Sequence, residues 1–151
     1  MTKPRNRRSD SAAAAVLAAQ NAALGTHEPL AHAPIIEAAR PFWEALMRNR
    51  PRDRWNDADL ANAAALALTQ CDVERLYREI AIEGDVIEGK LNPKHALVDK
   101  LVRRVMGLSR MLHVHPEATE GRSQDAGNAL NNERQAADDY DDLIPTLRVV
   151  A

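Results

Sequence analysis

Two long helical patterns between residues 57 and 112 constrain the fold more than any other part of the chain. The first pattern predicts a helix over about residues 58–83, and the second predicts a helix over about residues 93–112. Gly84 suits the position that follows a helix, and Asn92 before a proline suits the start of the next one. The chain is therefore predicted to be organised around a long antiparallel helical hairpin.

Apolar residues recur at helical spacing over more than half of the circumference of each predicted helix. One partner helix cannot cover so wide a surface, and soluble monomers rarely expose large apolar patches. We expect the hairpins of several copies to pack side by side around a rotation axis, as a homo-oligomeric ring. The alternative is that the N-terminal helices of the same chain cover the second face. The candidate interface residues are Leu66, Val73, Tyr77, Val98, Val102 and Met106.

The composition favours an all-α fold in a reducing compartment. Aromatic residues make up only 3% of the chain, so the core must depend on aliphatic packing between helices. β-branched residues never alternate with polar ones over a useful length, and no important sheet is expected. Cys71 is the single cysteine and excludes a disulfide framework. No apolar run approaches the roughly 20 residues that span a bilayer, and the alanine-rich start is too interrupted for an export signal.

Two shorter helices are expected before the hairpin, over residues 11–24 and 34–49. Pro41 lies inside the second pattern and should bend or break it near Ala39 or Arg40. Phe42 and Trp43 give this segment a strong apolar side, so it is the best candidate to cover part of the hairpin.

Charge is segregated along the chain, although the net charge is only −2. Residues 1–54 carry nine Lys and Arg against five acidic residues, and residues 117–151 carry three against eight. We therefore divide the chain into a basic arm (1–10), an N-terminal helical DNA-contacting region (11–54), a hairpin oligomerisation core (55–116) and an acidic flexible C-terminal tail (117–151). A basic front of this kind suggests an anionic partner.

Arginine and lysine neutralise phosphates without needing a shaped pocket, so the basic residues of the front are the candidates for DNA contact. The alternatives are an ordinary solubilising tail for residues 1–10 and a solvated connector for residues 48–54. A third basic group lies on the second hairpin helix, where it faces a ring channel or the outer wall of the ring. The alternative is a solvated face that pairs with acids of the first helix. The front set is Lys3, Arg5, Arg7, Arg8, Arg40, Arg48, Arg50, Arg52 and Arg54, and the helix set is Lys100, Arg103 and Arg110.

The C-terminal tail lacks apolar periodicity, and residues 117–142 are expected to be disordered or loosely attached. A small apolar terminus follows an acidic run and could dock on a protein partner, or pack back on the chain's own ring as a short strand. The candidate docking residues are Leu143, Ile144, Leu147 and Val149.

The sequence contains no phosphate-binding loop and no dinucleotide-binding glycine motif. His113 and His115 form a weak metal-like pair, with His95 as a possible third member, but no cysteine or carboxylate stands at a fixed spacing. Acidic and basic residues interleave on the first hairpin helix as on a solvated surface. We therefore expect a non-enzyme without cofactor, metal or membrane partner.

Three stretches carry a resemblance to a known family. They are RNRRSDSAAAAV at residues 5–16, PFWEALMRN at residues 41–49 and WNDADLANAAALA at residues 55–67. With the long hairpin and the acidic tail that follow, the chain resembles the small terminase subunit of tailed double-stranded DNA phages, in the cohesive-end packaging class. The resemblance covers nearly the whole chain.

This resemblance implies a ring that binds the packaging site of the viral genome and recruits and regulates the large terminase subunit, which holds the ATPase and nuclease. Its implied partners are further copies of itself, double-stranded DNA and the large subunit, in the host cytoplasm and outside the finished virion. The sequence departs from the family pattern in one respect, because no convincing helix-turn-helix can be placed near the N-terminus.

Two other interpretations remain open. A helix-turn-helix-like transcriptional regulator would more often be a dimer with a recognition helix in the major groove. A structural helical adaptor would have no affinity for DNA. The oligomer size, the DNA sequence, the path of DNA relative to the ring and the segment that contacts the large subunit are not encoded in any motif.

Overall fold

The computed structural model describes residues 12–114 and 124–143, and these residues are almost entirely helical. The described α-helices are α1 (Ala12–Leu24), α2 (Arg40–Met47), α3 (Asp57–Glu83), α4 (Lys94–Met111) and α6 (Gln124–Leu143). Two short 3-10 turns, η1 (Glu37–Ala39) and η2 (Arg52–Arg54), and two strands, β1 (Val86–Ile87) and β2 (Lys90–Leu91), complete this part of the chain. The expected all-α fold class is confirmed.

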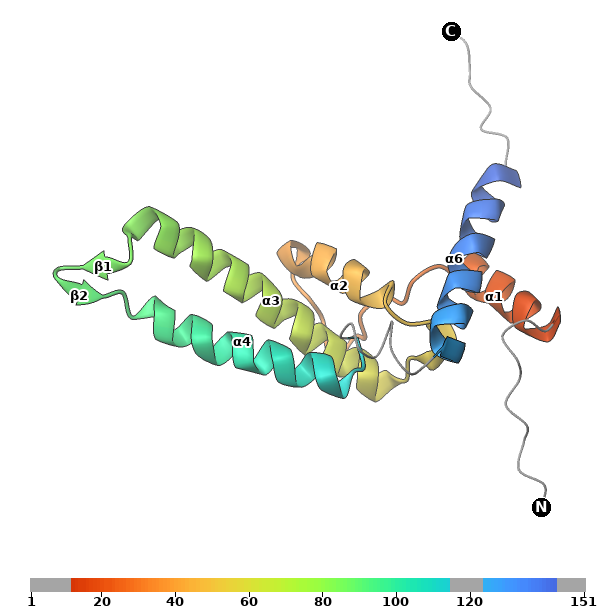
Figure 1. The fold of residues 1–151 in the computed structure, drawn as a ribbon, viewed down its shortest axis with the longest axis horizontal. Helices are drawn as coiled ribbons and strands as arrows, with labels where there is room; N and C mark the ends of the chain where they lie inside the picture. The colour runs from red at the N-terminus through yellow and green to blue at the C-terminus, as the bar shows by residue number, and fades with distance from the viewer. Residues whose placement is uncertain (1–11, 115–123, 144–151) are drawn as a thin grey trace, which may run out of the picture.

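Helices α3 and α4 form the long antiparallel hairpin that the sequence predicted (Figure 1). Asn56 caps α3, because its side-chain oxygen accepts from the backbone N–H of Asp59 at 2.9 Å. Gly84 ends α3 with a φ of +89°, a conformation that a side chain would strain. The buried side chain of Asn92 joins the two helices, because it donates to Glu83 and accepts from the backbone N–H of Lys94.

A small β-hairpin at the tip was not foreseen from the sequence. Strands β1 and β2 pair antiparallel, with Val86 opposite Leu91 and Ile87 opposite Lys90. Glu88 and Gly89 both have positive φ angles, as the two central residues of a type I′ turn require. The available signal was this two-residue polar turn between two short apolar pairs.

The hairpin is held by two apolar clusters. The distal cluster, near the tip, joins α3 to α4 through Leu76, Ile80 and Val98. The proximal cluster joins α2 and the segment before α3 to the N-terminal half of α3, and Leu112 from the end of α4 completes it. Helix α2 begins at Arg40 with Pro41 in its first turn, so the predicted break at this proline is confirmed.

The opposite end of the molecule, which we call the base, consists of α1 and α6 packed against each other (Figure 1). The expectation that residues 117–142 are disordered or loosely attached is wrong for the helical segment from residue 124 to 143. Partly buried Ala129, Leu130, Glu133 and Ala136 recur at helical spacing along α6. Because these side chains are small or half-polar, the sequence alone did not reveal this face of α6. It packs closely against the alanine surface of α1.

Burial also revises the candidate oligomer interface. Leu66 is fully buried in the proximal cluster and Val98 is buried in the distal one, so the chain's own helices already cover both. They belong to the core of the single chain. Tyr77 and Met106 are each 50% exposed and remain open to a partner. Among the described helices, none has both the length and the hydrophobicity for a bilayer crossing.

Replacing Leu66 by alanine should lower the free energy of unfolding by about 2–5 kcal/mol, because a cavity remains in a fully enclosed site. Ile82 lies on the same helix and is 86% exposed, so Ile82→Ala is the matched control and should change stability little. Chemical denaturation followed by circular dichroism measures both. Equal effects of the two substitutions would contradict the assignment of Leu66 to the core.

Candidate nucleic-acid interface

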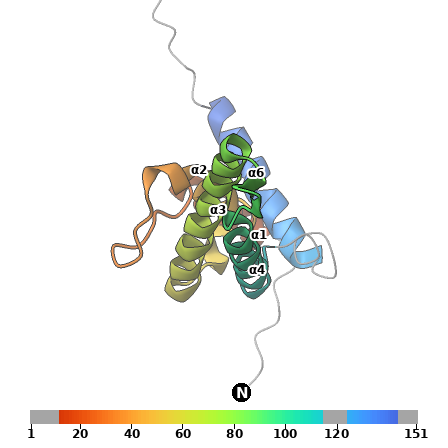
Figure 2. The ribbon, with the colours of Figure 1, turned by 90° about the vertical axis from the view of Figure 1, so that its left-hand side faces the viewer.

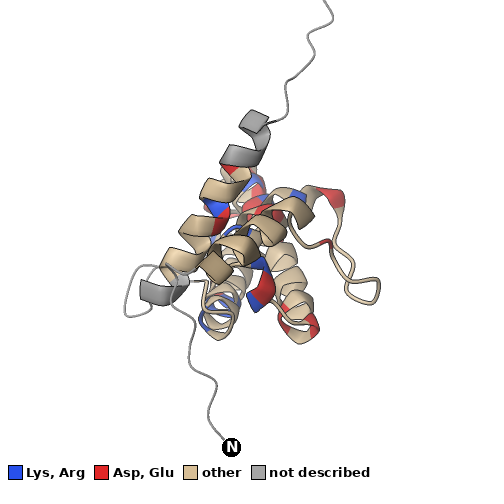
Figure 3. Ribbon diagram, turned by 90° about the vertical axis from the view of Figure 1, so that its right-hand side faces the viewer, with Lys and Arg blue, Asp and Glu red and all other residues tan. Residues whose placement is uncertain are grey.

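The connector between α2 and α3, residues 48–56, carries four arginines and lies at the base beside α1 and α6. Viewed from this end, basic and acidic residues are interspersed over the helices (Figure 3). Which arginines could contact a phosphate backbone therefore depends on which side chains the fold already uses.

Arg50 is a structural residue. Its guanidinium donates to the backbone carbonyls of Leu112, at 3.0 Å, and of Arg54. It also forms an ion pair with Asp59 at 3.2 Å and lies 4.5 Å from the centre of the Trp55 ring. This arginine thus fastens the start of α3 to the end of α4, and its side chain is only 19% exposed.

Arg52 and Arg40 are also engaged within the chain. The Arg52 guanidinium donates to the carbonyl of Gly25 at 2.7 Å, and this bond ties η2 to the end of α1. Arg40 pairs with Glu28 at 2.5 Å, and this carboxylate raises the pKa of Arg40. Both residues were candidates for DNA contact, and in the free chain both have intramolecular partners.

Among the described members of the predicted front set, Arg48 and Arg54 are the open ones. The Arg48 side chain is exposed and forms no ion pair within the described residues. Arg54 is 63% exposed and reaches Asp53 only at 3.9 Å. Arg134 of α6 lies beside Arg48 and donates to its backbone carbonyl at 2.9 Å. Sequence reasoning missed Arg134, because its segment was taken as a flexible acidic tail.

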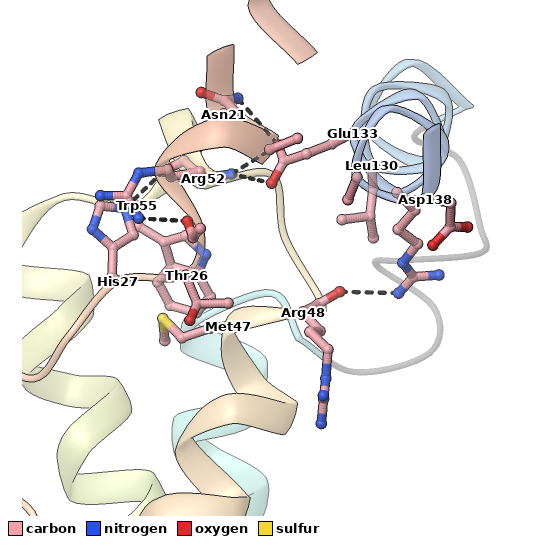
Figure 4. Close-up of a pocket in the computed structure, with 14 residues that line it drawn as sticks. Asn21, Thr26, His27, Met47, Arg48, Arg52, Trp55, Leu130, Glu133 and Asp138 are labelled. Atoms are coloured by element: carbon pink, nitrogen blue, oxygen red, sulfur yellow. Dashed lines mark hydrogen bonds between the residues drawn. The ribbon is translucent and has the colours of Figure 1, made fainter. Parts of the chain in front are cut away.

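A cavity of about 280 Å³ separates α6 from the body of the protein at this place (Figure 4). Met47, Trp55 and Leu130 give it apolar walls, while Arg48 and Arg134 stand at its edge. Helix α6 therefore meets the connector through a few polar contacts around an incompletely filled space.

Glu133 is the main polar anchor of α6. Its carboxylate accepts from the backbone N–H of Arg52, at 3.1 and 3.3 Å to its two oxygens, and from the side-chain amide of buried Asn21 at 3.1 Å (Figure 4). Asn21 also donates to Asp53 at 3.2 Å. Burial raises the pKa of Glu133, and the two hydrogen bonds only partly oppose that shift. The anchor thus joins α1, η2 and α6 through one carboxylate.

Lys94, at the start of α4, pairs with Glu79 and Glu83 of α3, but the basic residues farther along α4 contrast with those of α3. On α3, Arg75 pairs with Asp72 and Glu79, and Arg78 pairs with Glu74. On α4, Lys100, Arg103 and Arg110 are exposed, and none of them forms an ion pair within the described residues. Arg104 shares these properties and was not among the sequence candidates. The expected alternative, pairing with acids of the first helix, therefore does not occur in the free chain.

The remaining candidates include several residues outside the described part of the chain and one histidine inside it. Lys3, Arg5, Arg7, Arg8, His115, Ile144, Leu147 and Val149 lie outside the described residues. His95 bonds to Asp85 at 3.1 Å. Within residues 12–114 and 124–143, no three His, Cys, Asp or Glu side chains gather in a way that could hold a metal ion.

Comparison of the sequence with known proteins shows the family of this chain. The Hendrixvirinae small terminase family matches the chain over residues 1–151. The chain belongs to this family. It is also 35% identical over 134 residues to the terminase small subunit of Enterobacteria phage HK97, and the match covers 85% of this chain and 83% of the relative. The resemblance to small terminases is thus confirmed, and the family match includes the hairpin, α1 and α6.

Removing the Glu133 side chain should loosen the packing of α6 against α1 and the connector. In Glu133→Ala, the N–H of Arg52 and the amide of Asn21 lose their acceptor, which should cost about 1–3 kcal/mol. Glu133→Gln keeps an acceptor and removes the buried charge, so it is the matched control and should retain α6. Amide hydrogen exchange of α6 measures the difference.

The raised pKa of Glu133 adds a pH dependence with a defined sign. A carboxyl group whose pKa is higher in the folded state binds its proton more tightly there, so its contribution favours docking at low pH and is lost as pH rises through the folded pKa. Glu133→Gln should abolish this part of the pH dependence. A pH profile of α6 exchange that is the same in wild type and Glu133→Gln would contradict it.

Proposed function

We propose that this small terminase subunit forms a homo-oligomeric ring that recognises the packaging site of a phage genome and recruits and regulates the large terminase subunit. The observation that carries the proposal is the family match over the whole length of the chain. Cohesive-end packaging is part of the proposal and follows from the resemblance of the 41–49 and 55–67 stretches. The ATPase and nuclease chemistry belongs to the large subunit, so this chain acts as a non-enzymatic partner in the host cytoplasm.

Local basic surfaces support the DNA-binding part. The chain as a whole is slightly acidic, with a net charge of −2, so affinity must come from particular side chains. Arg48, Arg54 and Arg134 are exposed at the base, and Lys100, Arg103, Arg104 and Arg110 of α4 are exposed along the hairpin. A ring repeats each surface in every copy, and several weak contacts then give useful avidity.

The alternative of a helix-turn-helix regulator receives less support. In a helix-turn-helix, two helices are joined by a turn of about three or four residues. Helix α1 ends at Leu24 and α2 begins only at Arg40. Nine residues lie between the end of α2 and the start of α3 at Asp57. Neither pair in this part of the chain has the required spacing. Light scattering would separate the two functions, because a regulator is expected as a dimer and a packaging protein as a larger ring.

The direct test of the proposed function compares a DNA fragment that contains the phage packaging site with a shuffled fragment of the same length. We expect tighter binding to the packaging site, and we expect the bound complex to stimulate the ATPase of the large subunit. Equal affinity for both fragments without ATPase stimulation would overturn the proposal.

Replacing Arg48 and Arg54 together by alanine should weaken binding to all DNA sequences. The slope of log affinity against log salt should become shallower, as expected for the loss of about two phosphate contacts per engaged subunit. Folding should be little affected, because Arg48 forms no ion pair within the described residues and Arg54 reaches Asp53 only at 3.9 Å. Arg50→Ala is the informative comparison, since it should lower thermal stability through loss of its bonds to Leu112 and Asp59. Deleting residues 1–10 should also flatten the salt slope; an unchanged slope would show that the arm is only a solubilising tail.

Deleting residues 144–151 should weaken stimulation of the large subunit's ATPase while leaving helix content and oligomer size unchanged. A cut at residue 117 would be unsuitable, because it would also remove α6 and expose the face of α1 that α6 covers. ATPase assays with the large subunit and saturating DNA measure the effect. Full stimulation by the shortened chain would rule out these residues as the docking segment.

A further inference from the structure

The hairpin extends beyond the rest of the described chain, and its distal half is not covered by α2 (Figure 1). Seen along its long axis, α3 and α4 lie side by side, with α2 next to α3 (Figure 2). On α4, Val98 packs in the distal cluster and Val105 packs against the proximal one, so the line through these two residues faces α3. The two flanks of this line are therefore the sides of α4 that adjoin its contact with α3.

One flank carries a seam that we call the leucine face. Its members follow one another at alternating spacings of four and three residues, which is the heptad pattern of a helix that packs along another helix. Leu97 is 45% exposed and Met111 is 52% exposed, while two of the other members are only partly buried by the chain itself. The leucine face consists of Leu97, Leu101, Arg104, Leu108 and Met111.

The other flank contributes to a second surface that we call the tyrosine face. In an antiparallel pair of right-handed helices, the side of α3 that holds Val73 and Tyr77 continues into the side of α4 that holds Val102 and Met106. Tyr77 and Met106 are each half exposed, and the two valines are partly buried. The tyrosine face consists of Val73, Tyr77, Asp99, Val102 and Met106.

The two faces lie on opposite broad sides of one hairpin. A two-fold dimer uses the same patch on both copies, so it would leave one of these two faces exposed. A head-to-tail contact buries one face of each copy against the other face of the next copy. Such contacts close into a ring when the rotation per copy allows it. A second copy is thus the occupant that each face requires, because the hairpin presents both halves of the contact at the same level.

Charge complementarity supports the same pairing. Arg104 lies in the middle of the leucine face and Asp99 lies in the tyrosine face; both are exposed, and neither forms an ion pair within the described residues. Asp99 is also the only acidic residue of α4. In a ring without axial shift, the two residues of neighbouring copies differ in height by about 7.5 Å at 1.5 Å rise per residue. Helical side chains lean toward the N-terminus, so Arg104 reaches toward the level of Asp99.

We infer that the ring is held head to tail, with the leucine face of each copy packed on the tyrosine face of the next and Arg104 paired with the neighbour's Asp99. The inference rests on the self-association proposed above and adds which surfaces meet. The arrangement also gives Arg104 a role in assembly that is separate from contact with DNA.

The test is a charge exchange in the full-length chain. Arg104→Asp and Asp99→Arg should each place like charges together and raise the dissociation concentration of the oligomer about tenfold or more. The double variant restores opposite charges at every interface and should recover the wild-type mass. Light scattering over a dilution series gives the mass, and circular dichroism confirms that each variant is folded.

The outcomes separate the inference from the proposed ring. A wild-type chain that remains a monomer at all concentrations overturns both. An oligomeric wild type overturns the head-to-tail pairing alone if both single variants keep its mass, or if the double variant dissociates as readily as the single ones. Loss of assembly in both single variants with recovery in the double variant supports it.

Discussion

Close contact between the indole of Trp43 and the small-residue side of α3 is the interaction on which the proximal cluster depends. Ala63, Ala64 and Ala67 are all buried, and their short side chains let α2 approach closely enough to enclose the indole. The indole nitrogen donates to the carbonyl of His27 at 2.8 Å, so its one polar group is satisfied and the loop between α1 and α2 is held as well. A chain with so few aromatic residues thus concentrates its bulk where it positions several segments at once.

The connector after α2 shows how packing divides like residues into different roles. The arginines at 48, 50, 52 and 54 alternate along the sequence, and nothing in that pattern distinguishes them. Pro51 is buried and the 3-10 turn follows it, so Arg50 is directed onto Trp55 and Arg52 toward Gly25, while Arg48 and Arg54 remain exposed. Basic spacing therefore identified the segment, but only the contacts identified which members are free to bind an anion.

Elements with strong local signals were predictable from the sequence, and those formed by weak, distant contacts were not. The bounds of α3 and α4 followed from helix caps, Gly84 and long apolar stripes, and the start of α2 followed from Pro41. Helix α6 escaped because its buried side is made of alanine, one leucine and Glu133, which become a face only against α1. Leu66 and Val98 were assigned to the wrong surface because periodicity reports that a side chain is apolar and does not report which neighbour covers it.

The contact between α1 and α6 brings the two ends of the described chain together through Asn21, Glu133 and the backbone of Arg52. Segments that lead to the basic arm and to the apolar terminus therefore share one small set of hydrogen bonds. Any ligand whose affinity differs between the joined and separated forms of these helices is thermodynamically linked to every other such ligand, by the same factor in both directions. In this geometry, α1 and α6 are coupled through these hydrogen bonds, although more than a hundred residues separate Asn21 from Glu133 along the sequence.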